Sequence, residues 1–369
     1  MHESPQGRRS RRWLPWAALI GALVVGGVAG GAIVAATKSS ASTPASSATP
    51  SASGQVSVCD VTSVAAKVLP SVVTIAASGQ GGAGTGSGEI IRSDGYILTN
   101  NHVIAVAANG GSVQVQFSDG QTEPATITGR DPLTDLAVLK VDNTHKFPVI
   151  ALGSSSTVKV GEATVVLGAP LGLSGTVTSG IVSALDRTIQ VPAENDSTAL
   201  LVSAIQTDAS INPGNSGGAM VNCADQLVGV PTAGATVPTS SGESSGGSIG
   251  LGFAIPVDLA KTISDEIIAT GRVTHAYFGL QTVPVPPAAA AQAGVPEGLF
   301  VRAVLTGGPA AQAGLRAEDI ITKINGEPAV SNVQLQELTL TKKPGDTVSV
   351  EYWRSGHTAT TTVTLGTQP

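Results

Sequence analysis

From Ser71 to Ile255 the sequence consists of short runs of β-branched and other apolar residues, separated by glycine-rich turns. The runs are Val72–Ile75, Gly88–Ile91, Tyr96–Thr99, Val113–Phe117, Ala137–Val141, Ala163–Leu167, Gly175–Val182, Gln226–Val230 and Gly250–Ile255. Strands this short at this spacing favour an all-β barrel or sandwich. Because strands do not alternate with helical patterns, the sequence argues against a doubly wound α/β fold.

The first strong helical pattern covers residues 257–270 and divides the chain into two parts. Its apolar residues recur at helical spacing, a proline precedes it and a glycine follows it. We interpret this helix as the connector between an all-β domain at residues 58–271 and an α+β module at residues 272–369. The module is predicted to end with a strand pair at Thr347–Tyr352 and Thr360–Leu365.

The segment at residues 13–37 contains no charged residue and is long enough to span a bilayer. Four arginines precede it and only Lys38 follows directly, so the positive-inside rule places residues 1–12 in the cytoplasm and the rest of the chain outside. We therefore expect a single-pass membrane anchor with an N-terminal transmembrane helix. Residues 38–57 are Ser, Thr, Pro and Ala with little that could form a core, which indicates a flexible linker.

Two other interpretations of this segment remain open: a cleaved secretory signal, and a twin-arginine export signal suggested by Ser10–Leu14. The anchor is favoured because the apolar run is longer than a usual signal core and no A-x-A cleavage site closes it. All three interpretations place the folded part of the chain outside the cytoplasm.

Charge and cysteine content exclude other classes of protein. The formal net charge is −6 although arginines are concentrated at the extreme N-terminus, so the body is acidic and a nucleic-acid partner is not expected. The 2 cysteines lack C-x-x-C spacing, which gives no support to a structural zinc or a thioredoxin-like site. Outside the cytoplasm Cys59 and Cys223 could form one disulfide; the alternative is two unrelated buried thiols.

Three short segments carry groups suited to catalysis. Of the 5 histidines, only His102 follows directly on a predicted strand, where a sheet can hold an imidazole for proton transfer. Asp135 leads into an apolar strand, where a carboxylate can orient a histidine; Asp131, before a proline, is interpreted as a turn former. Ser216 is flanked by glycines that can expose its hydroxyl. The order His, Asp, Ser on an all-β body indicates nucleophilic acyl transfer.

The segments Thr99–Val103, Thr134–Val138 and Gly214–Gly218 resemble the three motifs of the HtrA/DegP serine proteases. The resemblance covers about residues 63–365 and implies a chymotrypsin-like double β-barrel followed by one PDZ domain. Patterns of the PDZ type are matched between Gly307 and Gly326.

The resemblance implies a role for each motif residue. Ser216 would be the nucleophile, His102 the general base and later acid, and Asp135 its orienting partner. The backbone N–H groups of Gly214 and Ser216 would form the oxyanion hole. No metal or organic cofactor is implied.

The substrate pocket is expected to include Ser210, Ile211 and Asn215. Ser210 stands where trypsin-like enzymes carry an aspartate, so the resemblance implies small or medium apolar side chains at the cleaved position rather than Lys or Arg. Asn215 stands where digestive relatives carry the aspartate that captures a new N-terminus, so we expect activity without proteolytic activation. Residues 232–250 are long and Gly/Ser-rich, which predicts either a mobile loop beside the pocket or an inert surface insertion.

The second module supplies a further expected binding site. Tyr277, Phe278, Gly279 and Leu280 resemble the carboxylate-binding loop of PDZ domains, which would capture C-terminal peptides as an added strand. The leading hypothesis is an anchored serine endopeptidase acting on unfolded or misfolded proteins, with trimers implied by the resemblance. The alternative is a chaperone or scaffold on the same fold with weak or silenced protease activity.

Overall fold

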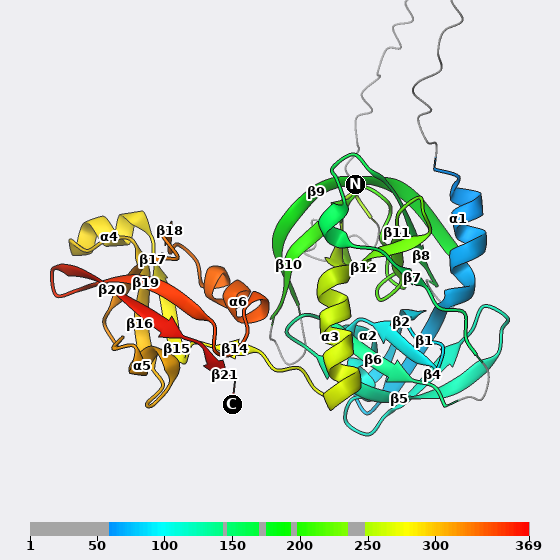
Figure 1. Ribbon diagram of the computed structural model, residues 1–369, viewed down its shortest axis with the longest axis horizontal. Coiled ribbons are helices and arrows are strands. Elements are labelled where there is room, and N and C mark those ends of the chain that lie inside the picture. Colours follow the sequence, from blue (N-terminus) through cyan, green and yellow to red (C-terminus); the bar gives the residue numbers. More distant parts are fainter. Residues whose placement is uncertain (1–58, 143–145, 170–174, 193–197, 235–247, 369) are drawn as a thin grey trace, which may run out of the picture. The chain divides into compact units, whose positions relative to one another are not determined.

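The computed structural model describes residues 59–142, 146–169, 175–192, 198–234 and 248–368, and these residues are mostly β-strand (Figure 1). The predicted cytoplasmic segment, anchor and linker at residues 1–57 lie outside the described residues. Within the described ranges, no helix is long and apolar enough to cross a membrane.

The first part of the chain forms a closed six-stranded barrel in the order β1-β2-β3-β6-β5-β4. The strands are β1 (Val72–Gly79), β2 (Gly82–Ile90), β3 (Tyr96–Thr99), β4 (Ser112–Gln116), β5 (Thr122–Asp131) and β6 (Leu136–Lys140). Their inward-facing apolar residues, among them Ile75, Ile97 and Leu139, make one core. A short helix α2 (Asn101–Ile104) and a 3₁₀ turn at Ala105–Ala107 follow β3.

The second part is a seven-stranded sheet in the order β11-β8-β9-β10-β13-β12-β7. Its strand pairs are antiparallel except for the parallel pair of β12 with β7. Because β11 also pairs with β12, six of these strands close into a ring and form a second barrel. The strands are β7 (Ala151–Leu152), β8 (Ala163–Gly168), β9 (Thr176–Pro192), β10 (Thr198–Thr207), β11 (Ala219–Val221), β12 (Gln226–Gly234) and β13 (Gly252–Pro256). The expected double barrel is therefore present.

The predicted helix at residues 257–270 is confirmed as α3 (Val257–Thr270), and Gly271 ends it in the left-handed conformation with φ 78°. The helix does more than connect domains. Ala260, Ile263 and Ile267 are buried against apolar residues of both barrels, including Leu98 of β3 and Leu201 of β10. α3 thus covers the seam between the barrels (Figure 1).

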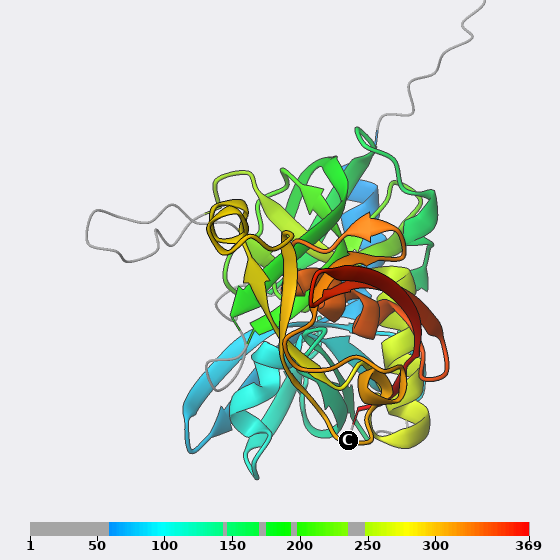
Figure 2. The same cartoon turned by 90° about the vertical axis from the view of Figure 1, so that its left-hand side faces the viewer.

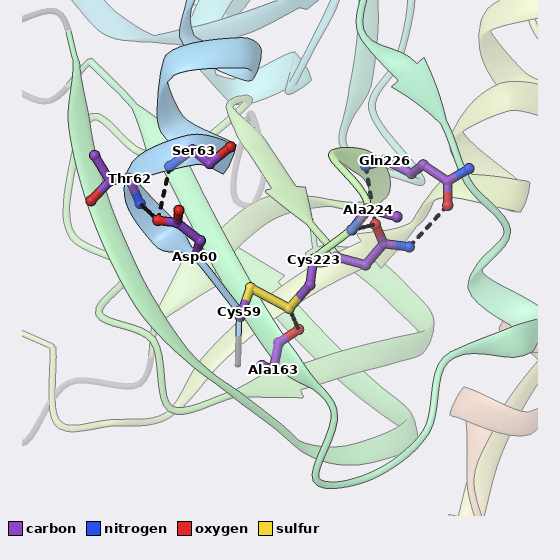
Figure 3. Close-up of a disulfide and its surroundings, with 9 residues drawn as sticks. Cys59, Asp60, Thr62, Ser63, Ala163, Cys223, Ala224 and Gln226 are labelled. Atoms are coloured by element: carbon purple, nitrogen blue, oxygen red, sulfur yellow. Dashed lines mark hydrogen bonds between the residues drawn. A yellow bond between two sulfur atoms is a disulfide. The ribbon is translucent and has the colours of Figure 1, made fainter. Parts of the chain in front are cut away.

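A helix that the periodicity did not predict, α1 (Val61–Val68), begins the described chain. Asp60 caps it by accepting hydrogen bonds from the N–H groups of Thr62 and Ser63 at 3.1 Å. A disulfide joins Cys59, just before the helix, to Cys223, just after β11 (Figure 3). The start of the described chain is therefore covalently tied to the second barrel.

The C-terminal module is a separate sheet in the order β15-β16-β17-β19-β20, with β18 beside β17 and a small pair of β14 with β21. The strands are β14 (Ala276–Tyr277), β15 (Leu280–Val285), β16 (Gly298–Val304), β17 (Ile320–Ile324), β18 (Glu327–Pro328), β19 (Thr347–Arg354), β20 (His357–Thr364) and β21 (Gly366–Thr367); the helices are α4 (Pro287–Ala293), α5 (Pro309–Gln312) and α6 (Asn332–Thr341). The predicted terminal strand pair is confirmed as the β19–β20 hairpin, which Figure 2 shows as a curved red ribbon. The module has its own apolar core.

Candidate active site

The three residues singled out by the sequence lie at the seam between the barrels. β3 ends at Thr99 and α2 carries His102, while Asp135 closes the turn between β5 and β6. His102 Nδ1 lies 2.8 Å from Asp135 Oδ2, and the main-chain N–H of His102 donates to Asp135 Oδ1 at 3.0 Å. The side chain of Asp135 is 6% exposed, whereas that of His102 is 40% exposed. A buried carboxylate therefore holds an imidazole that solvent can reach.

The turn that carries Asp135 is held by hydrogen bonds from both sides. Asp135 has a left-handed φ of 58°, which Asp tolerates better than most residues, and its carbonyl accepts from the N–H of Asn101 at 3.1 Å. Asp131 behaves as the predicted turn former, because its carboxylate accepts from the N–H of Leu133 and the hydroxyl of Thr134. His275 Nε2 also lies 2.9 Å from Asp131 Oδ1.

Ser216 lies in a tight loop between β10 and β11. Three N–H groups of this loop are held: that of Asn215 donates to Asn212 O, that of Gly217 to Pro231 O and that of Gly218 to Asn215 O, at 2.9–3.0 Å. Within the described residues, the N–H groups of Gly214 and Ser216 donate to no protein acceptor. Gly214 is buried and Ser216 is half-buried, and their role as an oxyanion hole stays a prediction.

The hydroxyl of Ser216 donates to the carbonyl of Thr232 at 3.2 Å. In the part of the chain that the structure describes, no hydrogen bond joins Ser216 to His102. Catalytic hydrogen bonds are often long in ligand-free sites and form when substrate binds. The hydroxyl therefore has to leave Thr232 before His102 can take its proton.

Sequence reasoning missed the role of Thr232. The threonine was expected to begin a loop, but it belongs to β12 and is buried, so the expected start of the loop at residue 232 is wrong. Its hydroxyl donates to Asp135 Oδ2 while its carbonyl accepts from Ser216. Thr232 thus connects the carboxylate and the serine. The only sequence signal was a β-branched residue continuing the run at residues 226–230.

The expected pocket residues have different environments. Ser210 is exposed, and its carbonyl accepts from the hydroxyl of Thr178 and the side-chain amide of Asn215. Ile211 packs in the core of the second barrel, where it fills the space beside Gly252. Asn215 is buried next to the serine. Their part in a substrate pocket stays a prediction.

A buried carboxyl lies in the same region. Glu89, on β2, is completely buried, and neither carboxylate oxygen has a hydrogen-bond partner among the described residues. Burial raises the pKa of Glu89 well above its usual value. No group of three His, Cys, Asp or Glu residues in the described ranges is arranged to hold a metal ion.

The expected carboxylate-binding loop connects β14 to β15. Gly279 has a left-handed φ of 75°, and the carbonyls of Phe278 and Gly279 accept from the N–H groups of Ala310 and Leu305 at 2.9 and 2.8 Å. β15 pairs with β16 on one side only, so it is an edge strand of the described sheet. An added peptide strand would meet this edge.

Comparison with known proteins agrees with this architecture. Residues 86–230 match the family model of the trypsin-like peptidase domain, and residues 276–365 match that of the PDZ domain. Fold and site therefore define a trypsin-like peptidase joined to a PDZ domain.

Relatives identify the family within this class. The chain is 44% identical over 313 residues to the serine protease PepD of Mycobacterium tuberculosis, covering 83% of this chain and 66% of PepD. It is 38% identical over 286 residues to a protein of Rhizobium meliloti named probable periplasmic serine endoprotease DegP-like, covering 77% of this chain and 53% of that protein. The solved HtrA-type protease AlgW with decapeptide superimposes with a TM-score of 0.66 at 32% identity, covering 84% of this chain and 99% of AlgW. The solved serine endoprotease from Yersinia pestis superimposes with a TM-score of 0.61 at 34% identity, covering 84% of this chain and 98% of that protein.

The chain belongs to the HtrA/DegP family of serine proteases. It spans between about half and two thirds of the length of these curated relatives.

Proposed function

We propose that this chain is an extracytoplasmic serine endopeptidase that cleaves unfolded or misfolded proteins. The observation that carries the proposal is the contact of a buried Asp135 with an accessible His102, linked through Thr232 to the hydroxyl of Ser216. Family membership supports the same chemistry.

In this mechanism Ser216 Oγ attacks the carbonyl carbon of the scissile peptide bond while His102 Nε2 takes its proton. The carboxylate of Asp135 keeps the other ring nitrogen protonated and stabilises the imidazolium. His102 then gives the proton to the leaving amine, and water releases the acyl group by the reverse sequence. The N–H groups of Gly214 and Ser216, which lack protein acceptors in the described ranges, stabilise the oxyanion; each such donor is typically worth about 2.7–4 kcal/mol in the transition state.

The proposal includes the parts of the chain around the catalytic domain. Residues 13–37 would anchor the protein in the membrane with the folded part outside, in line with relatives named periplasmic. The PDZ domain would bind C-terminal peptides at β15; AlgW has been solved with a decapeptide and with a tripeptide. Self-association, as trimers, rests on family resemblance. The preference for small or medium apolar residues at the cleaved position has the same basis.

The first test is covalent labelling of the full-length chain with a fluorophosphonate probe, together with cleavage of casein. We expect both in the wild type and neither in Ser216→Ala, because the probe reacts only with an activated serine. A peptide with a free C-terminal carboxylate, compared with its amidated form, tests control by the PDZ domain. A folded wild type that neither labels nor cleaves, but suppresses aggregation of an unfolded protein, would leave the chaperone or scaffold alternative.

A further inference from the structure

Ser87, on β2 of the first barrel, uses all of its polar groups in contacts around the candidate site. It is 0% exposed. Its hydroxyl donates to Gly214 O at 2.6 Å and accepts from the N–H of Ala169 at 2.7 Å. Its N–H donates to Ser216 O at 2.9 Å, and its carbonyl accepts from the hydroxyl of Thr99 at 2.7 Å.

Two of these contacts hold the residues on either side of Asn215, in the loop between β10 and β11. The hydroxyl of Ser87 holds the carbonyl of Gly214, and its main-chain N–H holds the carbonyl of Ser216. These are the same two residues whose N–H groups have no acceptor within the described residues. We propose that Ser87 is the positioning residue of the oxyanion hole: it fixes, from the first barrel, the loop whose amides stabilise the transition state. This inference rests on the proposed function.

The backbone conformation of the loop explains why these hydrogen bonds from Ser87 are needed. Gly214 has φ 102°, a region that glycine enters freely and other residues avoid, so the covalent chain alone restrains this position weakly. The peptide group between Gly214 and Asn215 is held at its N–H by Asn212 and at its carbonyl by Ser87. Without the hydroxyl of Ser87, the carbonyl of Gly214 loses its hydrogen bond, and this peptide group is held at its N–H alone.

Two glycines lie directly against Ser87. A Cβ built on Gly217 would lie 2.4 Å from Ser87 O, and one built on Gly168 would lie 3.0 Å from Ser87 Oγ. The absence of side chains at these glycines lets two segments, one at Gly168 and one at Gly217, approach Ser87 directly. Truncation of Ser87 would leave the Gly214 carbonyl and the Ala169 N–H, both buried, without this partner.

The expected effect is on the chemical step. Removing an oxyanion donor lowers kcat by about 10²–10³, and donors must lie within a few tenths of an ångström of their place. A loop that is loosened rather than deleted should lose less. We expect Ser87→Ala to lower kcat about 10–100-fold with KM within about threefold of wild type, because substrate binding uses other contacts.

The test compares full-length wild type, Ser87→Ala, Ser87→Cys and Ser71→Ala. Ser71 is the matched control: it is buried, and its hydroxyl donates to Val68 O at 2.7 Å, away from the site. The measurements are kcat and KM on a peptide anilide with valine at the cleaved position, the inhibition constant of the matching peptidyl boronic acid, and the melting temperature. The boronic acid forms a tetrahedral adduct on the serine and therefore reports the oxyanion hole.

In the expected result, boronic acid affinity falls in parallel with kcat in Ser87→Ala, and Ser87→Cys lies between it and wild type because a thiol is a weaker donor. Ser71→Ala has a lower melting temperature than wild type but an unchanged kcat. The inference is overturned if kcat and boronic acid affinity of Ser87→Ala stay within about twofold of wild type, or fall equally in Ser71→Ala. If Ser87→Ala does not fold, unchanged kcat in Ser87→Cys overturns it. A wild type that lacks fluorophosphonate labelling overturns the proposed function, and the inference with it; a labelled wild type separates the two.

Discussion

At the scale of single residues, the sequence reveals a residue that lies in a local motif, but not one whose role depends on a contact with a distant part of the chain. His102, Asp135 and Ser216 each sit in a motif that sequence alone could single out, and the structure brings all three to the seam between the barrels. Thr232 and Ser87 carry no such motif. Their contacts are made across the fold, with residues 97 and 127 positions away in the chain, so no short window of sequence contains both partners.

Glu89 gives a prediction at this scale, since its carboxyl is completely buried and its pKa is raised by burial. The folded protein keeps this proton to a higher pH than the unfolded chain does. The contribution of Glu89 is therefore most favourable below the ordinary carboxyl pKa, and stability is lost as the pH rises toward the raised value, by up to about 1.4 kcal/mol per pH unit. Glu89→Gln removes this loss. We expect its melting temperature to exceed that of wild type near neutral pH and to converge with it at acid pH.

Thermal unfolding between acid and neutral pH checks this, with Glu351→Gln as control. Glu351, on β19, is half-buried, and its carboxyl accepts a hydrogen bond from the hydroxyl of Thr322. This hydrogen bond, followed by the contact with Lys323, lowers the pKa of the carboxyl. Its replacement should give no gain at neutral pH. A Glu89→Gln variant that is less stable than wild type at every pH would show that the carboxyl has a partner that needs its charge.

At the scale of elements, the sequence predicted most strands and the bounds of α3, because alternation and helical periodicity are local properties. The periodicity did not predict α1, a helix of 8 residues whose stability depends on its cap and on the apolar residues it buries against the second barrel. The closure of each set of strands into a barrel also could not be derived from periodicity. It came from resemblance to a family and is confirmed by the strand order.

The edge of β15 carries a prediction at this scale. Asn332, the first residue of α6, donates from Nδ2 to the carbonyl of Thr282 at 3.1 Å and accepts from the hydroxyl of Thr282 at 2.7 Å. A peptide that adds to β15 as a strand has to compete with this amide for the Thr282 carbonyl. We expect Asn332→Ala to bind a C-terminal peptide up to about tenfold more tightly, the value of one ordinary hydrogen bond.

Fluorescence anisotropy with a labelled peptide measures this affinity, and the amidated peptide shows how much binding depends on the carboxylate. Thr339→Ala, on the same helix, serves as control because, among the described residues, its hydroxyl bonds only to the helix carbonyl of Gln336. Weaker binding by Asn332→Ala would mean that Asn332 contacts the ligand rather than competing with it.

At the scale of the whole molecule, the disulfide between Cys59 and Cys223 closes a long covalent loop. It joins residues 164 positions apart, from the start of the described chain to the segment after β11. Since the cross-link restricts the unfolded chain over that whole length, we expect Cys59→Ser with Cys223→Ser to lose about 2–5 kcal/mol of unfolding free energy. Urea unfolding in oxidising buffer measures this loss.

The nearby ion pair of Lys67 with Asp225 provides the control. Its lysine side chain is 62% exposed, so Lys67→Ala should cost no more than about 1 kcal/mol. If the double serine variant were as stable as wild type, or if reducing agent left wild type unchanged, the covalent loop would contribute nothing to stability.

The position of the sulfur–sulfur bond also decides where force enters the protein. The chain before Cys59 leads toward the segment expected in the membrane, so any pull on the folded part arrives at Cys59. Without the bond, such a pull would peel α1 away from the barrel one contact at a time. With it, the load also passes directly to the segment after β11, and thus to the barrel that carries Ser216.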